Sequence, residues 1–204
     1  MRKLAVVLGV CAMGAFVANA GTVSYGWEDG VGTVLAVYPA GQMIATNVGA
    51  PDPIHTGDRS LKLEDNAASG TPQAYVAWIT GLADGDVVEA SIWRYDTTPS
   101  TSPSCRIWGH WNDDPNDVNG YDGSAGGNED YGPGEGWDQT LWSWVVADGH
   151  TGLVIEIRTY SNPGDVVWVD DMTVAAPNHA TIIVPEAVSP VHETSWSTIK
   201  EFYR

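Results

Sequence analysis

The sequence contains little cysteine and few basic residues. Its 204 residues include 2 Cys, and 9 Lys plus Arg against 26 Asp plus Glu, which gives a formal charge of -17. After position 3, no two bases lie closer than three residues apart. No local basic patch therefore offsets the repulsion of phosphate backbones, which argues against nucleic acids as partners.

Long apolar runs are confined to the start of the chain. Arg2 and Lys3 precede an apolar run that ends in Ala-Asn-Ala, the pattern of a cleaved secretory signal peptide. The alternatives are a membrane anchor, for which the run is shorter than the roughly 20 residues of a span, and a lipid anchor at Cys11. We expect residues 1–20 to be removed and the mature protein to be secreted, extracellular or periplasmic, with no membrane insertion.

Removal of this segment leaves one cysteine, Cys105, and a charge of -19, because seven bases then face 26 acids. A lone thiol forms no intramolecular disulfide, so the exported fold must depend on packing or on a metal ion. No basic partner or nucleophile motif stands beside Cys105. We expect it to be a small buried apolar residue.

Helical periodicity is also missing between residues 21 and 176. Short alternating or apolar runs recur there, separated by clusters of Gly, Pro, Asp and Asn, which is typical of an all-β sandwich. The predicted strands cover residues 33–37, 60–63, 74–79, 86–95, 105–111, 140–146, 153–160 and 166–174. The sequence predicts one antiparallel sandwich domain over residues 21–176.

Two segments do not fit this pattern. Residues 112–138 form a long Gly-rich insertion with eight acids and no base, which we expect to be a structureless functional or mobile loop. Residues 177–204 form a linker and a C-terminal tail, in which Trp196, Ile199 and Tyr203 would share one side of a short helix. The tail either docks on the sandwich or frays, or it is an interaction or sorting tag with a protein partner.

Aromatic residues are unevenly represented, with 10 Trp but only 2 Phe. Sugar rings stack on aromatic rings, and their hydroxyls need hydrogen-bonding partners. Strand alternation turns one set of aromatic and charged side chains outward, so the sequence predicts a carbohydrate-binding face. Its residues are Trp93, Tyr95, Arg106, Trp108, His110, Glu156 and Arg158. We expect Trp111, Tyr121 and Trp137 to wall the groove from the side of the acidic loop. The Trp residues expected in the core are Trp78, Trp142, Trp144 and Trp168.

Four short motifs cover residues 27–30 (WEDG), 57–63 (GDRSLKL), 81–88 (GLADGDVV) and 167–174 (VWVDDMTV). In this order they resemble the galactose-binding-like jelly-roll modules of carbohydrate-binding families 4, 9, 16 and 22. The resemblance extends over most of the predicted domain. It implies an antiparallel jelly-roll β-sandwich that binds glycans without catalysis.

The same resemblance implies a structural calcium ion. In these modules the acid of the first motif and the first Asp of the last motif meet at the ion, together with backbone carbonyls of the second motif. Carried over, this names Glu28 and Asp170, with the carbonyls of Ser60 and Lys62. Calcium takes six to eight oxygen ligands, and it would join the two ends of a disulfide-free sandwich. The alternatives are that both carboxylates are solvated or paired with Arg59 or Lys62, and that the acidic insertion binds metal.

Two other functions stay open from the sequence. A small jelly-roll glycoside hydrolase would need two facing carboxyls about 5 to 10 Å apart, and Glu89 and Glu156 are the strand glutamates that alternation turns outward. A structural or adhesive surface protein would use the sandwich as a scaffold. The predicted function is a secreted, non-catalytic protein that recognises a neutral polysaccharide or oligosaccharide and is stabilised by calcium.

Overall fold

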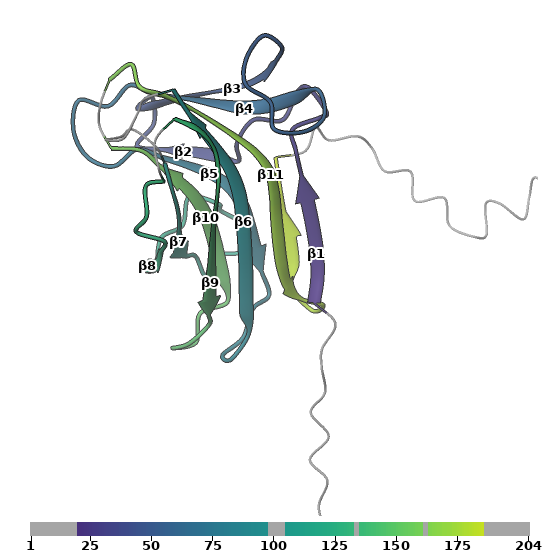
Figure 1. Cartoon of the computed structure of the whole chain (residues 1–204). Helices are drawn as coiled ribbons and strands as arrows, with labels where there is room; N and C mark the ends of the chain where they lie inside the picture. The colour runs from purple at the N-terminus through teal and green to yellow at the C-terminus, as the bar shows by residue number, and fades with distance from the viewer. Residues whose placement is uncertain (1–19, 98–104, 133–134, 161–162, 186–204) are drawn as a thin grey trace, which may run out of the picture.

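The computed structural model describes residues 20–97, 105–132, 135–160 and 163–185 (Figure 1). Every regular element within these ranges is a β-strand. In this described part of the chain, no helix has the length and apolar character needed to cross a membrane. The expected signal peptide, apart from Ala20, and the expected tail helix lie outside the described residues.

The described strands form two six-stranded sheets that pack as the layers of a sandwich (Figure 1). The first sheet has the order β3-β4-β11-β6-β9, with β1 beside β11. Its strands are β1 (Ala20–Tyr25), β3 (Met43–Gly49), β4 (Arg59–Asp65), β6 (Val87–Asp96), β9 (Gly136–Val145) and β11 (Val166–Pro177). The second sheet has the order β12-β5-β10-β7-β8, with β2 beside β5. Its strands are β2 (Ala36–Tyr38), β5 (Gln73–Thr80), β7 (Arg106–Trp111), β8 (Gly123–Gly127), β10 (Gly152–Arg158) and β12 (Thr181–Ile183).

The core lies between the sheets and is built by strand alternation. Val88 and Ile92 of β6 lie in one buried cluster with Ile155 and Ile157 of β10, because successive side chains of a strand point to opposite faces. Cys105 is fully buried in the same cluster, and burial raises the pKa of its thiol to about 12. Packing thus holds the described fold together, in which Cys105 forms no disulfide.

The predicted fold class is confirmed, and each predicted strand overlaps a strand of the structure. The strands β1, β3, β8 and β12 were not predicted. The acidic insertion is not structureless, because it contains β8, a glycine-rich strand with little intrinsic β preference that pairs with β7. The sandwich also extends past the boundary expected at residue 176, because β12 pairs with β5 and the Tyr25 hydroxyl donates to the Pro185 carbonyl at 2.8 Å.

The tryptophans are mostly structural. Trp78, Trp144 and Trp168 are buried, whereas Trp142 on the edge strand β9 is 38% exposed. Of the three buried rings, Trp144 lies in the core cluster between the sheets, and Trp78 packs with Tyr75 in a separate cluster. Trp27, which was not assigned to the core, is fully buried. Its Nε1 donates to the Thr33 carbonyl at 2.7 Å, so both the ring and the polar atom are held inside the fold.

We expect Trp27→Ala to lower the free energy of unfolding by about 3 to 5 kcal/mol, because it leaves a large cavity in the core. Trp142→Ala is the matched control, with an expected loss of about 1 kcal/mol or less at a partly exposed edge position. Urea denaturation followed by circular dichroism measures both. Equal losses in the two variants would contradict this assignment of the core.

Candidate functional site

The residues predicted to form one carbohydrate-binding face lie on opposite sides of the sandwich. The first sheet carries Trp93, Tyr95 and Trp137. The second sheet and the loop after β7 carry Arg106, Trp108, His110, Trp111, Tyr121, Glu156 and Arg158. The expectation of one shared face is therefore wrong. Alternation fixes the side of a strand on which a residue lies, but it does not say which sheet the strand joins.

On the outer side of the first sheet, the aromatic cluster is covered by the chain itself. The ring of His55 stacks on Trp93 with the centroids 4.0 Å apart and meets Trp137 edge-on at 5.2 Å. Tyr95 packs against Trp137 at 5.3 Å. One face of Trp93 is thus already occupied by His55, which leaves less of this cluster for a sugar ring to stack on.

On the outer side of the second sheet, Glu156 is fully buried between two basic side chains. Its Oε1 is hydrogen-bonded to His110 Nδ1, and its Oε2 accepts a hydrogen bond from Arg158 Nε at 2.6 Å. His110 is also fully buried, and its Nε2 lies 3.1 Å from the Gly120 carbonyl. His110 and Glu156 were expected to face solvent; they do point away from the core, but the loop after β7 covers them.

The two Trp residues of β7 are also engaged in packing. The guanidinium carbons of Arg106 and Arg158 lie 4.9 and 4.7 Å from the centroid of the Trp108 ring, within the range of cation–π contacts. Trp111 pairs with the core residue Leu153 and stacks on His150 at 4.8 Å. Trp111 therefore lies on the core side of β7 and does not wall the outer face.

A cavity of about 450 Å³ opens on this outer side, beside the Glu156 cluster. Its lining residues are Tyr38, Thr71, Gln73, Tyr75, Asn119, Tyr121, Ser124 and Arg158. Tyr38 and Tyr121 are 57% and 66% exposed, whereas Tyr75 is buried. Burial, together with the charge of Glu156, raises the pKa of Tyr75 above its ordinary range. Tyrosine rings with a few amide and guanidinium groups match the composition of a sugar site.

Of the predicted residues, the lining of this cavity contains Tyr121 and Arg158. Tyr75 was missed because β5 carries an irregularity opposite the Ile155–Glu156 step of β10, and both Val76 and Ala77 face the core. Strict alternation counted back from Ala77 would therefore place Tyr75 on the core side, whereas it lies on the outer side. Tyr38 directly follows the predicted strand 33–37. Extending that strand by one residue would have included it.

The two glutamates of the hydrolase alternative do not face each other. Glu89 is exposed on the outer side of the first sheet, next to the buried core residues Val88 and Ala90. Glu156 points to the outer side of the second sheet. Packed sheets lie about 10 Å apart, so the two carboxyls are farther apart than the roughly 5 to 10 Å that glycoside hydrolysis requires. A hydrolase that uses this pair is excluded.

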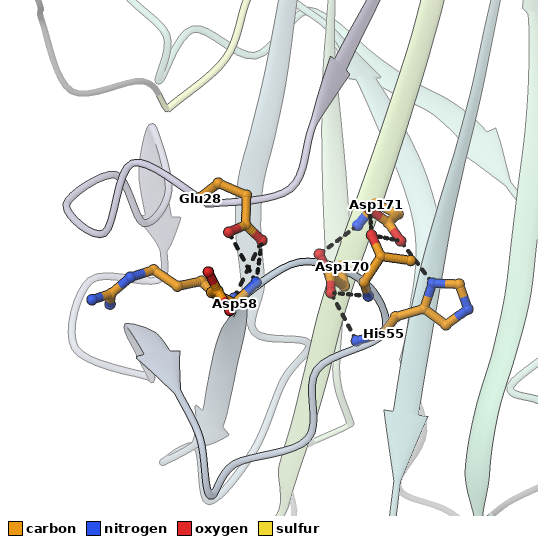
Figure 2. A network of polar contacts seen from close by, with 7 residues as sticks. Glu28, His55, Asp58, Asp170 and Asp171 are labelled. Carbon is orange, nitrogen blue, oxygen red and sulfur yellow. Dashed lines mark hydrogen bonds and ion pairs between the residues drawn. The ribbon is translucent and has the colours of Figure 1, made fainter.

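The two carboxylates expected at a calcium ion both bind the segment before β4 (Figure 2). Asp170 is fully buried and accepts hydrogen bonds from the backbone amides of His55 at 2.9 Å and Thr56 at 3.3 Å. Glu28 accepts one from the amide of Asp58 at 3.0 Å. Burial raises the pKa of Asp170 to about 6, since no Lys or Arg of the described residues forms an ion pair with it.

Gly26 lies close to all three carboxylate side chains of this region. A Cβ atom at Gly26 would lie 3.5 Å from Oδ1 of both Asp170 and Asp171, and 3.8 Å from Cγ of Glu28. Trp27 and Asp171, the neighbours of the two expected ligands, both adopt left-handed backbone angles, with φ of 58° and 44°. Residues in such conformations occur often at functional sites.

The side chains alone do not complete a metal shell. In the described ranges, no three His, Cys, Asp or Glu side chains form a group that could hold an ion, so backbone carbonyls would be needed. Leu61 pairs with Val169, which places Ser60 next to Asp170 in the ladder. The Lys62 ammonium, which was an alternative partner for these carboxylates, lies 5.8 Å from the Trp168 ring centroid. Oxygen donors from Glu28, Asp170 and nearby carbonyls fit calcium.

The structure is similar to several solved carbohydrate-binding modules. The CBM22-1 xylan-binding domain of Xyn10C from Paenibacillus barcinonensis gives a TM-score of 0.52 at 14% identity, over 76% of this chain and 93% of that one. The C-terminal family 22 module of Xyn10B from Clostridium thermocellum gives 0.53 at 13% identity, over 77% and 93%. This chain shares the jelly-roll sandwich fold of these modules.

The tandem CBM22-1–CBM22-2 domain of the same Paenibacillus barcinonensis protein gives a TM-score of 0.54 at 13% identity, over 85% of this chain and 50% of that one. No family model and no curated protein matches the sequence. At these identities the comparison shows the fold. It confirms the jelly-roll resemblance inferred from the four motifs and the presence of family 22 among the similar folds.

With no cation bound, the buried Asp170 should make stability depend on pH. The pKa of this carboxyl is about 6 in the folded protein against an ordinary value of 3.8, so between these values the folded state binds more protons than the unfolded state. The free energy of unfolding therefore falls as pH rises from about 4 to about 6, by up to about 3 kcal/mol. Urea denaturation in chelator should show this slope in the wild type. In Asp170→Asn the slope should be smaller, and an unchanged slope would contradict the assignment.

Proposed function

We propose that this protein is a secreted, non-catalytic glycan-binding module. The observation that carries the proposal is the tyrosine-lined cavity on the outer side of the second sheet. Its volume lies within the range of about 300 to 1,000 Å³ of small-molecule sites. The fold it shares with carbohydrate-binding modules supports the same function.

The lining residues divide between stacking and hydrogen bonding. Tyr38 and Tyr121 offer exposed aromatic rings to the C–H faces of sugars. Gln73 and Asn119 supply amide donors and acceptors for sugar hydroxyls. Arg158 also lines the cavity. Among the described residues only its Nε takes part in a hydrogen bond, so its terminal nitrogens add donors for a sugar. This arrangement binds and orients a sugar but offers no pair of facing carboxyls.

The first ligands to test are neutral polysaccharides. One module with a similar fold is described as xylan-binding, so xylan is the natural starting point. Cello-oligosaccharides and mannan provide comparisons with other linkages and ring substituents. A module of this kind would recognise a short segment of one chain rather than a crystalline surface, because its rings line a cavity and not an open plane.

We also propose a structural calcium ion held by Glu28 and Asp170. The ion would neutralise the buried carboxylate of Asp170 and link the end of β1 to β11 through the segment before β4. It supplies charge compensation and cohesion only. The proposed glycan cavity lies on the other sheet, so the ion would not contact the ligand.

Tyr121→Ala should weaken glycan binding about tenfold or more, because the ring supplies a large part of the stacking surface and each 1.4 kcal/mol corresponds to a factor of ten. Trp93→Ala is the control for the opposite face, and we expect it to bind with unchanged affinity. Isothermal titration calorimetry with xylo-oligosaccharides measures both. Loss of binding in Trp93→Ala but not in Tyr121→Ala would overturn the site, and absence of binding to any glycan would favour a scaffold or adhesive role.

Calcium should raise the thermal stability of the protein. At about 100 times its dissociation constant, a ligand specific for the folded state adds about 2.7 kcal/mol, which corresponds to about 5 to 10 °C in Tm for a domain of this size. Calorimetric melts with calcium and with chelator should show this difference in the wild type. Glu28→Gln should reduce it. An identical Tm in both conditions would refute the calcium proposal without touching the glycan site.

A further inference from the structure

We infer that the cavity recognises an acidic sugar on an otherwise neutral polysaccharide, and that Arg158 binds the carboxylate of that sugar. This inference rests on the proposed glycan-binding function and names the class of ligand for the same cavity. Three features carry it: the charge of the Glu156 cluster, the absence of carboxylates from the lining, and the free donors of Arg158.

The cluster below the cavity carries a net positive charge. A carbonyl oxygen only accepts hydrogen bonds, so His110 Nε2 donates to Gly120. The hydrogen bond between His110 Nδ1 and Glu156 Oε1 needs a proton on one of its two atoms. An imidazolium with a carboxylate and an imidazole with a carboxylic acid have the same total charge of zero. Arg158 then adds one positive charge in either case.

The groups that face the ligand contain no negative charge. The cavity is lined by three tyrosines, two amides, two hydroxyl side chains and Arg158, with no Asp or Glu. The carboxyl group of Glu156, which binds Arg158 Nε, is fully buried and does not line the cavity. In a protein with a formal charge of -17, this lining is a local exception to the acidic character of the chain.

Arg158 is placed to form a charge-assisted pair with a carboxylate. Its side chain is 14% exposed and lines the cavity. The bond from Nε to Glu156 and the contact with the Trp108 ring fix the orientation of the guanidinium. The terminal nitrogens have no hydrogen bond to another described residue, which leaves them for a planar bidentate contact of the kind that guanidinium makes with carboxylates.

The charge of the whole protein does not prevent this contact. At an ionic strength of 0.15 M the Debye length is about 8 Å, so acidic groups elsewhere on the surface are largely screened. A partly buried pair at the floor of the cavity is screened much less. Isolated acidic side groups on a neutral chain fit such a site better than a dense polyanion, which the remaining surface would repel.

The test uses the intact mature protein and two forms of one ligand. Glucuronic-acid-substituted xylo-oligosaccharides are compared with the same oligosaccharides after reduction of the carboxyl groups, by calorimetry at 0.15 M salt. We expect the acidic form to bind about tenfold more tightly, since hydrogen bonds to charged groups are the stronger class. Equal affinity overturns the acidic-sugar inference and leaves the proposed function intact. Absence of binding to both forms overturns both.

Substitution of the guanidinium identifies the residue responsible. Arg158→Gln should bring the affinities for the two ligand forms within about twofold of each other. Arg59→Gln, which removes the same charge from the first sheet, should keep the preference for the acidic form. A preference that persists in Arg158→Gln overturns the role of Arg158. Because the comparison of ligands uses the wild-type protein, the inference is tested even where Arg158→Gln fails to fold.

Discussion

The outer side of the second sheet is organised by the buried carboxylate of Glu156. A carboxylate without contact to water costs several kcal/mol unless charged partners and hydrogen bonds compensate it. His110 and Arg158 supply these partners. Since His110 in turn donates to the Gly120 carbonyl, the same interaction holds the loop after β7 against the sheet. Tyr121 follows Gly120 directly, so one wall of the cavity depends on Glu156.

Side-chain hydrogen bonds also hold the acidic insertion, residues 112–138, in a defined path. Its Asp and Asn side chains cap their own backbone, as in the bonds from the Asn116 amide to Asp114 and from the Asn119 amide to Asp117, both 2.9 Å long. Such Asx turns let a segment with few apolar residues keep a fixed path. The nearly buried Arg94 binds Asp138 at 2.7 Å further along the chain. The acids of this segment thus serve local structure.

Strand periodicity was sufficient to predict the fold but not the site. The alternation along β6 and β7 separates core from surface correctly for Val88 and Ile107. It does not show that these consecutive strands enter different sheets, which places Trp93 and Trp108 on opposite sides. That separation follows from long-range pairing, since β6 pairs with β9 and β11, whereas β7 pairs with β8 and β10. In β5, a local register shift places both Val76 and Ala77 on the core side and Tyr75 on the outer side, which alternation does not predict.

Tryptophan and tyrosine have different roles in this fold, so the high Trp content does not mark the proposed binding site. Several indole nitrogens are bonded inside the protein, as in the bonds from Trp27 to the Thr33 carbonyl, Trp108 to Ser124, Trp144 to the Gly126 carbonyl and Trp168 to Asp52. A ring held in this way contributes area to a sandwich that has no disulfide. The proposed cavity instead presents Tyr38 and Tyr121, whose smaller rings carry a hydroxyl that water can hydrate when no sugar is bound. The many Trp residues therefore stabilise the sandwich and its outer faces, whereas the tyrosines and the single arginine on the outer side of the second sheet would contact the ligand.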